Sequence, residues 1–238
     1  VSLRDLGEEM AGFALTGPRA RAVIESLTDA NVGALPFMGC GAFDVGMMQT
    51  HVARMSVAGE LGYEISCRMG DHIKLRDTLL AAGTDHDLRE YGFNAMLSLR
   101  LEKSFGIWSA EFRQEYTPGM TGLDRWIAWD KGNFVGRDAA IAERDGNGPA
   151  KVVRTLEVEA TDADASGYEP VWMNGSRVGY VTSGGYGHTV GKSLALALIE
   201  VHAADPGTEL TVHVVGEERP ARVIEASPYD PGGHAMRA

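Results

Sequence analysis

One predicted helix carries an arginine on its apolar face, and this position limits what the surrounding chain can fold into. The apolar positions of the helix are Phe93, Met96, Leu97 and Leu101. Rotation by about 100° per residue places Arg100 among them, whereas Glu102 points away. A buried arginine needs a carboxylate or carbonyl partner, since removing one partner of a buried pair costs about 3–5 kcal/mol. Arg100 is therefore interpreted either as a structural salt bridge between helix and sheet or as an anchor for a ligand.

An extended segment carries two glutamates that suggest a polar site. Residues 57–65 read Val-Ala-Gly-Glu-Leu-Gly-Tyr-Glu-Ile and predict a strand with Glu60 and Glu64 on one face. At about 3.3 Å per residue the two carboxylates lie about 13 Å apart, which is too far for them to share a proton. One of them can instead accept paired hydrogen bonds from the N–H and NH2 edge of a ring such as a pterin. A solvated strand edge explains the two residues equally well.

The composition indicates an acidic globular protein. The 238 residues are 44% apolar and 23% charged, which suits one large domain or two small ones with a sizeable core. The formal net charge of -11, with 22 scattered basic residues, argues against a nucleic-acid-binding surface. No run approaches the roughly 18 apolar residues that cross a bilayer, so no membrane partner is expected.

The cysteines and the first residue bear on the context of the chain. Cys40 and Cys67 have no Cys or His neighbours at metal-ligand spacing, so neither a metal site nor a disulfide framework is expected. Two such cysteines in an acidic protein favour a reducing, cytoplasmic location. Because the chain begins with Val1 rather than methionine, we expect an excised or truncated piece of a longer polypeptide.

The first 148 residues predict an α+β domain, with helices on one face of an antiparallel sheet. A strand at 12–15 leads into a helix that Thr16 caps, two antiparallel strands follow between 43 and 68, and helices follow at 70–82 and 87–103. The residues expected to point inward after position 43 are Val45, Met47, Val52, Met55, Leu61, Tyr63, Ile65, Cys67, Ile73, Leu79 and Leu80.

Residues 149–238 predict a small C-terminal β-barrel domain, with a sandwich as the alternative. Short strands at 152–159, 177–182, 194–201, 209–215 and 221–225 are separated by turn residues. Asn174-Gly175 is typical of a hairpin turn. The glycine-rich stretch 185–193 has Tyr186 where a phosphate-binding loop requires glycine, and no long helix follows, so a nucleotide site is not expected.

Aromatic residues gather directly after the arginine-bearing helix. They are Trp108, Tyr116, Trp126 and Trp129. Such rings usually belong to a core or a domain interface. Trp108 is the best placed of them to stack instead on a flat bound heterocycle.

Short motifs along the whole chain point to a known family. In order they are Gly17-Pro18, Gly59–Ile65, Ser98–Lys103, Glu115–Pro118, Gly122–Asp124, Asp130-Lys131, Phe134–Arg137, Gly179–Gly184 and Lys192–Ala195. This series resembles the aminomethyltransferase fold shared by the glycine cleavage T protein and the folate-binding C-terminal region of dimethylglycine and sarcosine dehydrogenases. The Ser98–Lys103 and Lys192–Ala195 motifs look closer to the dehydrogenase branch.

The resemblance implies a three-part disc that binds tetrahydrofolate, of which this chain would hold the middle layer and the C-terminal barrel. It implies that Glu64 contacts the pterin and that Trp108 lines the folate site. Arg100 matches the arginine of the family's Leu-Arg-Leu-Glu segment. Together with Glu60, these are the candidate cofactor-binding residues, and no catalytic residue is assigned.

The sequence also departs from the family pattern. Val57 stands where the family usually has a tyrosine against the folate, and Met96 stands where the T protein has an arginine. The dehydrogenase branch also lacks that arginine. The family's aspartate that acts on the amine lies upstream of the position matched by Val1, so no residue here inherits its role.

The resemblance implies tetrahydrofolate-dependent one-carbon transfer, as the folate module of a dimethylglycine or sarcosine dehydrogenase-like enzyme. The expected partners are folate, a small N-methylated amine, and a flavin-dehydrogenase domain or a second copy of the chain. FAD would belong to a separate upstream domain, because the chain has no dinucleotide-binding glycine motif. The alternatives are a non-catalytic folate- or small-ligand-binding or assembly domain, and a demethylase of another methylated small molecule.

Overall fold

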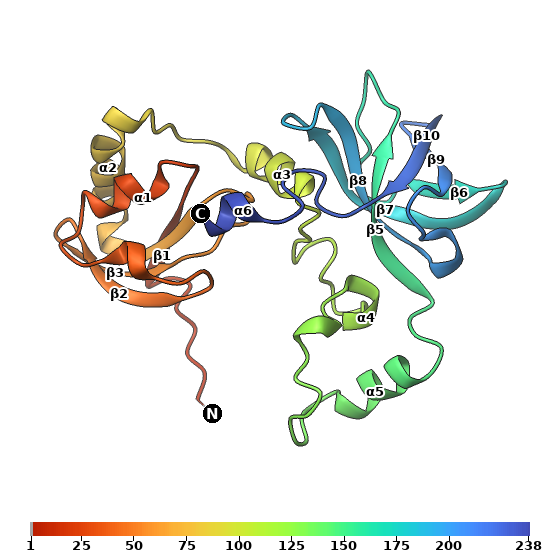
Figure 1. Cartoon of the computed structure of the whole chain (residues 1–238), viewed down its shortest axis with the longest axis horizontal. Coiled ribbons are helices and arrows are strands. Elements are labelled where there is room, and N and C mark those ends of the chain that lie inside the picture. Colours follow the sequence, from red (N-terminus) through yellow and green to blue (C-terminus); the bar gives the residue numbers. More distant parts are fainter. Residues whose placement is uncertain (1) are drawn as a thin grey trace. The chain divides into compact units, whose positions relative to one another are not determined.

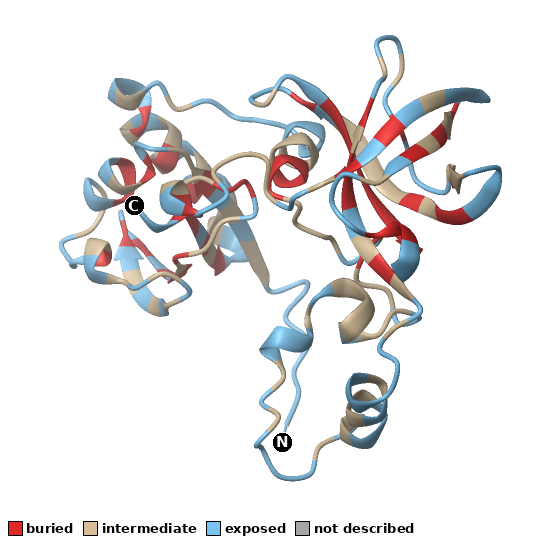
Figure 2. Cartoon of the chain, turned by 45° about the vertical axis from the view of Figure 1, so that its right-hand side comes forward, coloured by how far each residue is buried: buried red, intermediate tan, exposed pale blue. Residues whose placement is uncertain are grey.

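The computed structural model describes residues 2–238, so Val1 and the expectation attached to it lie outside the described residues. The chain folds into two compact units, of which the first comprises the residues up to Met96 together with Gly232–Ala238, and the second comprises Leu97–Pro231. Their elements are labelled in Figure 1, and Figure 2 shows in red that each unit has buried residues of its own. The sequence-based division between residues 148 and 149 stays a prediction.

The first unit is a four-stranded antiparallel sheet with helices packed on one face, as predicted. Its strands are β1 (Met10–Thr16), β2 (Cys40–Val45), β3 (Met48–Ala53) and β4 (Gly62–Arg68), in the spatial order β1-β4-β3-β2. Its helices are α1 (Ala20–Glu25), α2 (His72–Ala82) and the C-terminal α6 (His234–Arg237). Alternate strand residues such as Leu15, Tyr63 and Ile65 form one core with the inner faces of α1 and α2.

Three strands, and not the predicted two, lie between residues 40 and 68. Val45 pairs with Met48 across a tight turn in which Gly46 has a φ of 58°, a backbone conformation that suits glycine. The turn shifts the inward positions by one residue, because successive strand residues face opposite sides. Met48 is therefore 2% exposed, whereas Met47, predicted to point inward, is 88% exposed.

Two further predictions for this unit need correction. Glu60 precedes β4 in a bend and does not share a strand with Glu64. Helix α2 buries Leu75 and Leu79, which lie four residues apart on one helix face, whereas Ile73 is 62% exposed. The predicted inward positions Leu61, Tyr63, Ile65 and Cys67 are confirmed.

The second unit is built around a closed six-stranded barrel, which confirms the barrel prediction. The strands are β5 (Lys151–Val158), β6 (Pro170–Met173), β7 (Ser176–Gly187), β8 (Lys192–Glu200), β9 (Glu209–Val214) and β10 (Glu217–Ile224), and they close in the order β10-β5-β8-β7-β6-β9. Strand β6 has only four residues and was not predicted. The remaining helices are α3 (Phe93–Glu102), which leads into this unit, α4 (Pro118–Thr121) and α5 (Arg137–Asp145).

Two hairpins of the barrel agree with their sequence patterns. Asn174 and Gly175 form the β6–β7 turn with φ values of 51° and 77°, as expected for such a pair. The glycine-rich stretch 185–193 forms the end of β7, a turn and the start of β8. No helix among residues 2–238 is long and apolar enough to cross a membrane.

Candidate functional site

The last turn of α3 and the residue that follows it carry three charged side chains that are almost completely buried. Arg100, Glu102 and Lys103 are 2%, 1% and 2% exposed. Between them Leu101 packs against Leu194 and Leu196 on the outer side of the barrel wall. This apolar contact keeps water away from the neighbouring charged side chains, so each of them needs a polar partner.

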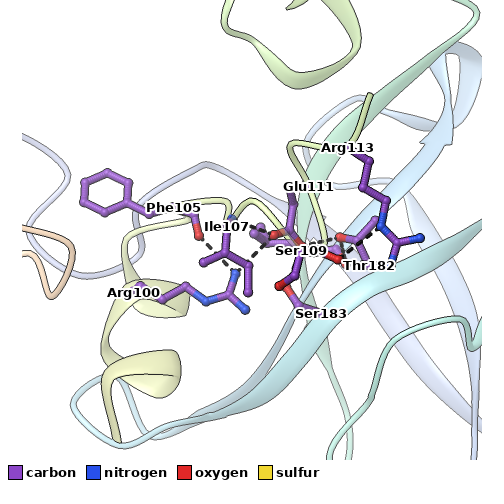
Figure 3. Close-up of polar contacts among 9 residues, drawn as sticks. Arg100, Phe105, Ile107, Ser109, Glu111, Arg113, Thr182 and Ser183 are labelled. Atoms are coloured by element: carbon purple, nitrogen blue, oxygen red, sulfur yellow. Dashed lines mark hydrogen bonds and ion pairs between the residues drawn. The ribbon is translucent and has the colours of Figure 1, made fainter. Parts of the chain in front are cut away.

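Arg100 pairs with Glu111, as the structural interpretation of this arginine requires (Figure 3). Its Nη1 donates to the Phe105 carbonyl oxygen at 3.0 Å and lies 3.4 Å from Glu111 Oε2. Burial lowers the pKa of the Arg100 guanidinium, and the negative charge of Glu111 opposes that shift. Glu111 is itself only 1% exposed.

The carboxylate of Glu111 joins the chain after α3 to the barrel wall. Its Oε2 accepts from the Ile107 backbone N–H at 3.0 Å. Its Oε1 accepts from the hydroxyls of Thr182 at 2.5 Å and Ser183 at 2.6 Å, both on β7 (Figure 3). Charged hydrogen bonds of this kind are among the stronger ones in proteins.

Glu102 and Lys103 hold two other segments of the second unit. Glu102 Oε1 accepts from the backbone N–H groups of Thr189 at 2.6 Å and Val190 at 3.0 Å, so the anion bound by the glycine-rich turn is a protein carboxylate. Glu102 was predicted to point away from the apolar face that holds Arg100, and on its own side of the helix it is buried against this turn. Lys103 Nζ donates to the carbonyl oxygens of Tyr229 at 3.0 Å and Asp230 at 2.6 Å.

Trp108 lies on the turn between Arg100 and Glu111 and is 83% exposed. Its ring meets the ring of Phe112 edge-on, with 6.0 Å between the ring centres. A large exposed ring on an ordered turn is suited to stacking on a flat ligand, because little conformational entropy is lost when it binds. Of the other predicted aromatics, Trp126 is also exposed, at 70%.

Glu64 belongs to the first unit and is exposed on β4. Its cross-strand neighbours are Ala14 on β1 and Ala53 on β3, so small side chains flank it on both sides. The half-exposed Tyr91 is close enough for the charge of Glu64 to add to the effect of burial, and together they raise the pKa of the Tyr91 phenol. Glu60 is partly buried in the bend before β4.

An apolar groove adjoins this part of the first unit. It has a volume of about 380 Å³ and lies between β1, α2 and the segment 88–96. Ala14, the cross-strand neighbour of Glu64, and Tyr91 both line it. The groove can accept the flat apolar part of a ligand whose polar edge meets a carboxylate.

Sequence reasoning found Arg100 but missed Glu111. The need for a carboxylate partner followed from the helix pattern, but the partner lies eleven residues further on, beyond an irregular turn. No periodicity relates two residues across such a turn. Among residues 2–238, no three His, Cys, Asp or Glu side chains are grouped as metal ligands.

Comparisons with known proteins agree with the motifs. Residues 1–131 match the family model described as the GCVT N-terminal domain, and residues 151–230 match the Glycine cleavage T-protein C-terminal barrel domain. Mitochondrial dimethylglycine dehydrogenase of Homo sapiens is 31% identical over 228 residues, which cover 94% of this chain and 26% of that protein. The aminomethyltransferase of Bacillus subtilis (strain 168) is 31% identical over 231 residues, which cover 96% of this chain and 63% of that protein.

A solved structure shows the same fold. The crystal structure of glycine cleavage system aminomethyltransferase T from Bartonella henselae matches with a TM-score of 0.83 and 25% identity, over 93% of this chain and 60% of that one. The chain thus spans about a quarter of the dehydrogenase and less than two thirds of the aminomethyltransferases. With both family models matched in order, the chain belongs to the glycine cleavage T-protein family.

Proposed function

We propose that this chain is the folate-binding part of a tetrahydrofolate-dependent one-carbon transferase of the dimethylglycine or sarcosine dehydrogenase type. The match to the T-protein family over 1–131 and 151–230 supports the reaction class. The similarity to dimethylglycine dehydrogenase supports an N-methylated amine as donor. The observation that carries the proposal is the exposed carboxylate of Glu64 between two alanines, a geometry that can accept the paired N–H donors of a pterin.

Tetrahydrofolate, when bound, supplies the two nitrogens, N5 and N10, that take up the carbon released from the amine. Glu64, in the first unit, orients the pterin through its carboxylate. Trp108, in the second unit, is the proposed stacking residue for a flat ring of the ligand. Arg100 acts indirectly, because its buried side chain supports the turn that carries Trp108. Glu60, in the bend before β4, completes the proposed set of cofactor-binding residues.

Further parts of the proposal concern partners and location. FAD would be held by another domain of a longer polypeptide or by a partner protein. A cytoplasmic location is proposed from the sequence features, whereas the dimethylglycine dehydrogenases of Homo sapiens and Mus musculus are named as mitochondrial. The alternative, a non-catalytic ligand-binding or assembly domain, is motivated by Val57, whose aliphatic side chain cannot stack on a pterin as a tyrosine can.

Calorimetric titration with tetrahydrofolate tests the proposal. We expect the wild-type chain to bind, and Glu64→Ala to weaken binding by more than about tenfold, which corresponds to a loss above about 1.4 kcal/mol. Asp44→Ala is the matched control, because Asp44 is an exposed carboxylate on the same sheet face, two strands away. It should leave the affinity within about twofold of wild type.

Two results would count against the proposal. A folded wild-type chain that does not bind tetrahydrofolate would favour the non-catalytic alternative. Equal effects of Glu64→Ala and Asp44→Ala would show that Glu64 has no specific contact with the pterin.

A further inference from the structure

The turn that carries Trp108 is fixed at several points along its length. We define it as the Trp108 turn, residues 105–112. Arg100 Nη1 binds the carbonyl oxygen of Phe105 at its start, and Glu111 Oε2 binds the N–H of Ile107 near its middle. The Ile107 carbonyl oxygen in turn accepts from the backbone N–H groups of Ala110, Glu111 and Phe112 at 3.0–3.2 Å. These hydrogen bonds hold residues 107–112, which include Trp108, in a tight backbone turn.

One carboxylate also fixes this turn to the barrel. The four donors to Glu111 are Arg100, the Ile107 N–H, and the hydroxyls of Thr182 and Ser183 on β7. These donors use the acceptor capacity of both oxygens, and two of them come from a strand of the barrel wall (Figure 3). A carboxylate with so many partners has little freedom to move, and neither have the residues next to it.

The fixed turn ends at the ring that meets Trp108. Phe112 directly follows Glu111, and its ring stands at 73° to the indole. The indole itself is 83% exposed, so the buried network supports a side chain that contributes little to the core. A rigid support beneath an exposed aromatic ring is the arrangement expected of a preorganised binding residue.

We propose that Glu111, paired with Arg100, is a positioning residue that holds Trp108 ready to stack on a flat ligand. The inference rests on the proposed function in one respect, namely that the flat ligand is the pterin of tetrahydrofolate. The placement of the turn is a property of the free protein and can be measured without any ligand.

The test compares Glu111→Gln with the matched variant Glu102→Gln. Both glutamates are 1% exposed, belong to the second unit and accept backbone N–H groups. They differ in what they hold, because Glu102 binds the turn between β7 and β8 and Glu111 binds the Trp108 turn. A general loss of stability should therefore be similar in the two variants, whereas an effect on Trp108 should not.

Hydrogen exchange followed by mass spectrometry gives the first readout. In Glu111→Gln we expect faster exchange in a peptide covering 105–112, with the peptide covering 188–194 unchanged. In Glu102→Gln we expect faster exchange in the peptide covering 188–194 and unchanged exchange in the peptide covering 105–112. Unchanged exchange at 105–112 in folded Glu111→Gln would overturn the proposal.

Calorimetric titration with tetrahydrofolate gives the second readout. We expect affinity to fall by about five- to tenfold in Glu111→Gln, as for the loss of one preorganised side chain, and by less than about twofold in Glu102→Gln. Equal weakening by both variants would reduce Glu111 to a structural role and overturn the proposal. A wild-type chain that fails to bind would contradict the proposed function, and exchange at the Trp108 turn would still decide the positioning role of Glu111.

A milder variant keeps the test decisive if Glu111→Gln does not fold. Ser183→Ala removes one of the four donors and leaves the carboxylate and Arg100 in place. It should speed exchange at 105–112 and weaken binding by about two- to fivefold. A folded Ser183→Ala protein with wild-type exchange and affinity would contradict the proposal.

Discussion

Two lysines of the second unit show how burial decides what a charge contributes. Lys103 is 2% exposed, donates to two carbonyl oxygens and lies 3.7 Å from Asp230 Oδ2. Lys192 is about half exposed and pairs with Glu157 at 2.8 Å. Water screens the second pair but does not reach the first, so the two cations should differ in their effect on stability.

We expect Lys103→Met to lower the free energy of unfolding by about 1.5–3 kcal/mol, because it leaves two partly buried carbonyl oxygens without their charged donor. Lys192→Met, the matched control, should change it by less than about 1 kcal/mol. Urea unfolding followed by tryptophan fluorescence measures both values. Similar losses from the two substitutions would mean that Lys103 is not held as the structure shows.

Residue-level reasoning succeeded where local geometry decides the outcome. Helical spacing alone predicted that Arg100 is buried, and the structure confirms this. The rest of the predicted apolar face is only partly buried, because Leu101 is buried but Phe93 is 66% exposed. The same spacing did not show that Glu102 is buried, because the β7–β8 turn covers that side of the helix end. Which side of a helix is exposed to solvent depends on the segments that pack against the helix, and a local sequence pattern does not show where those segments lie.

At the scale of elements, β7 depends on glycines where it crosses close to β8. A Cβ atom at Gly179 would overlap the Leu198 carbonyl oxygen and would lie 2.8 Å from Ile199 Cα. The register of β7 against β8 shifts between Val181 and Ser183, a local irregularity of the kind that lets a sheet bend into a barrel. The close approach thus belongs to the closure of the barrel.

Gly179→Ala should therefore destabilise the second unit by about 1–3 kcal/mol, the usual cost of overpacking. Gly132→Ala is the matched control, since Gly132 lies in the same unit and a Cβ atom there would have nothing within 4 Å. It should change stability by less than about 0.5 kcal/mol. Equal midpoints of urea unfolding for Gly179→Ala and wild type would contradict the close packing of β7 against β8.

The longer strands were predicted from the sequence, and the shortest strand was not. The continuous apolar run of β8 and the end of β10 were found, together with the Asn174-Gly175 turn. The four-residue β6 was missed, because so short a segment shows no alternation to detect. Strands β2 and β3 were mislocated because Gly46 and Met47 form a tight turn within one apolar stretch.

At the scale of the whole molecule, the two units carry different natural probes. All four tryptophans lie between Leu97 and Pro231, so their fluorescence reports on the second unit. Cys67 is fully buried in the first unit, and burial raises the pKa of its thiol, so it has less reactive thiolate than an exposed cysteine at the same pH. Cys40, in contrast, is exposed.

In a Cys40→Ser background, Cys67 should react with a thiol reagent at pH 8 only as the first unit unfolds. Because each unit has its own core, Gly179→Ala should shift the fluorescence transition to lower urea and leave the thiol transition in place. Parallel shifts of both transitions would show that the chain unfolds as one cooperative body. Rapid reaction of Cys67 in the native protein would contradict its burial on β4.

The sequence by itself determined the family, the α+β layer followed by a barrel, and the need for a partner to Arg100. These follow from local spacing and from ordered motifs, both of which are visible in the order of the residues. Only the tertiary structure decided that Glu111 is that partner, that Glu102 is buried, and that Glu60 and Glu64 do not share a strand. Each of these depends on segments distant in sequence or on irregular turns, where contact is set by packing and not by periodicity.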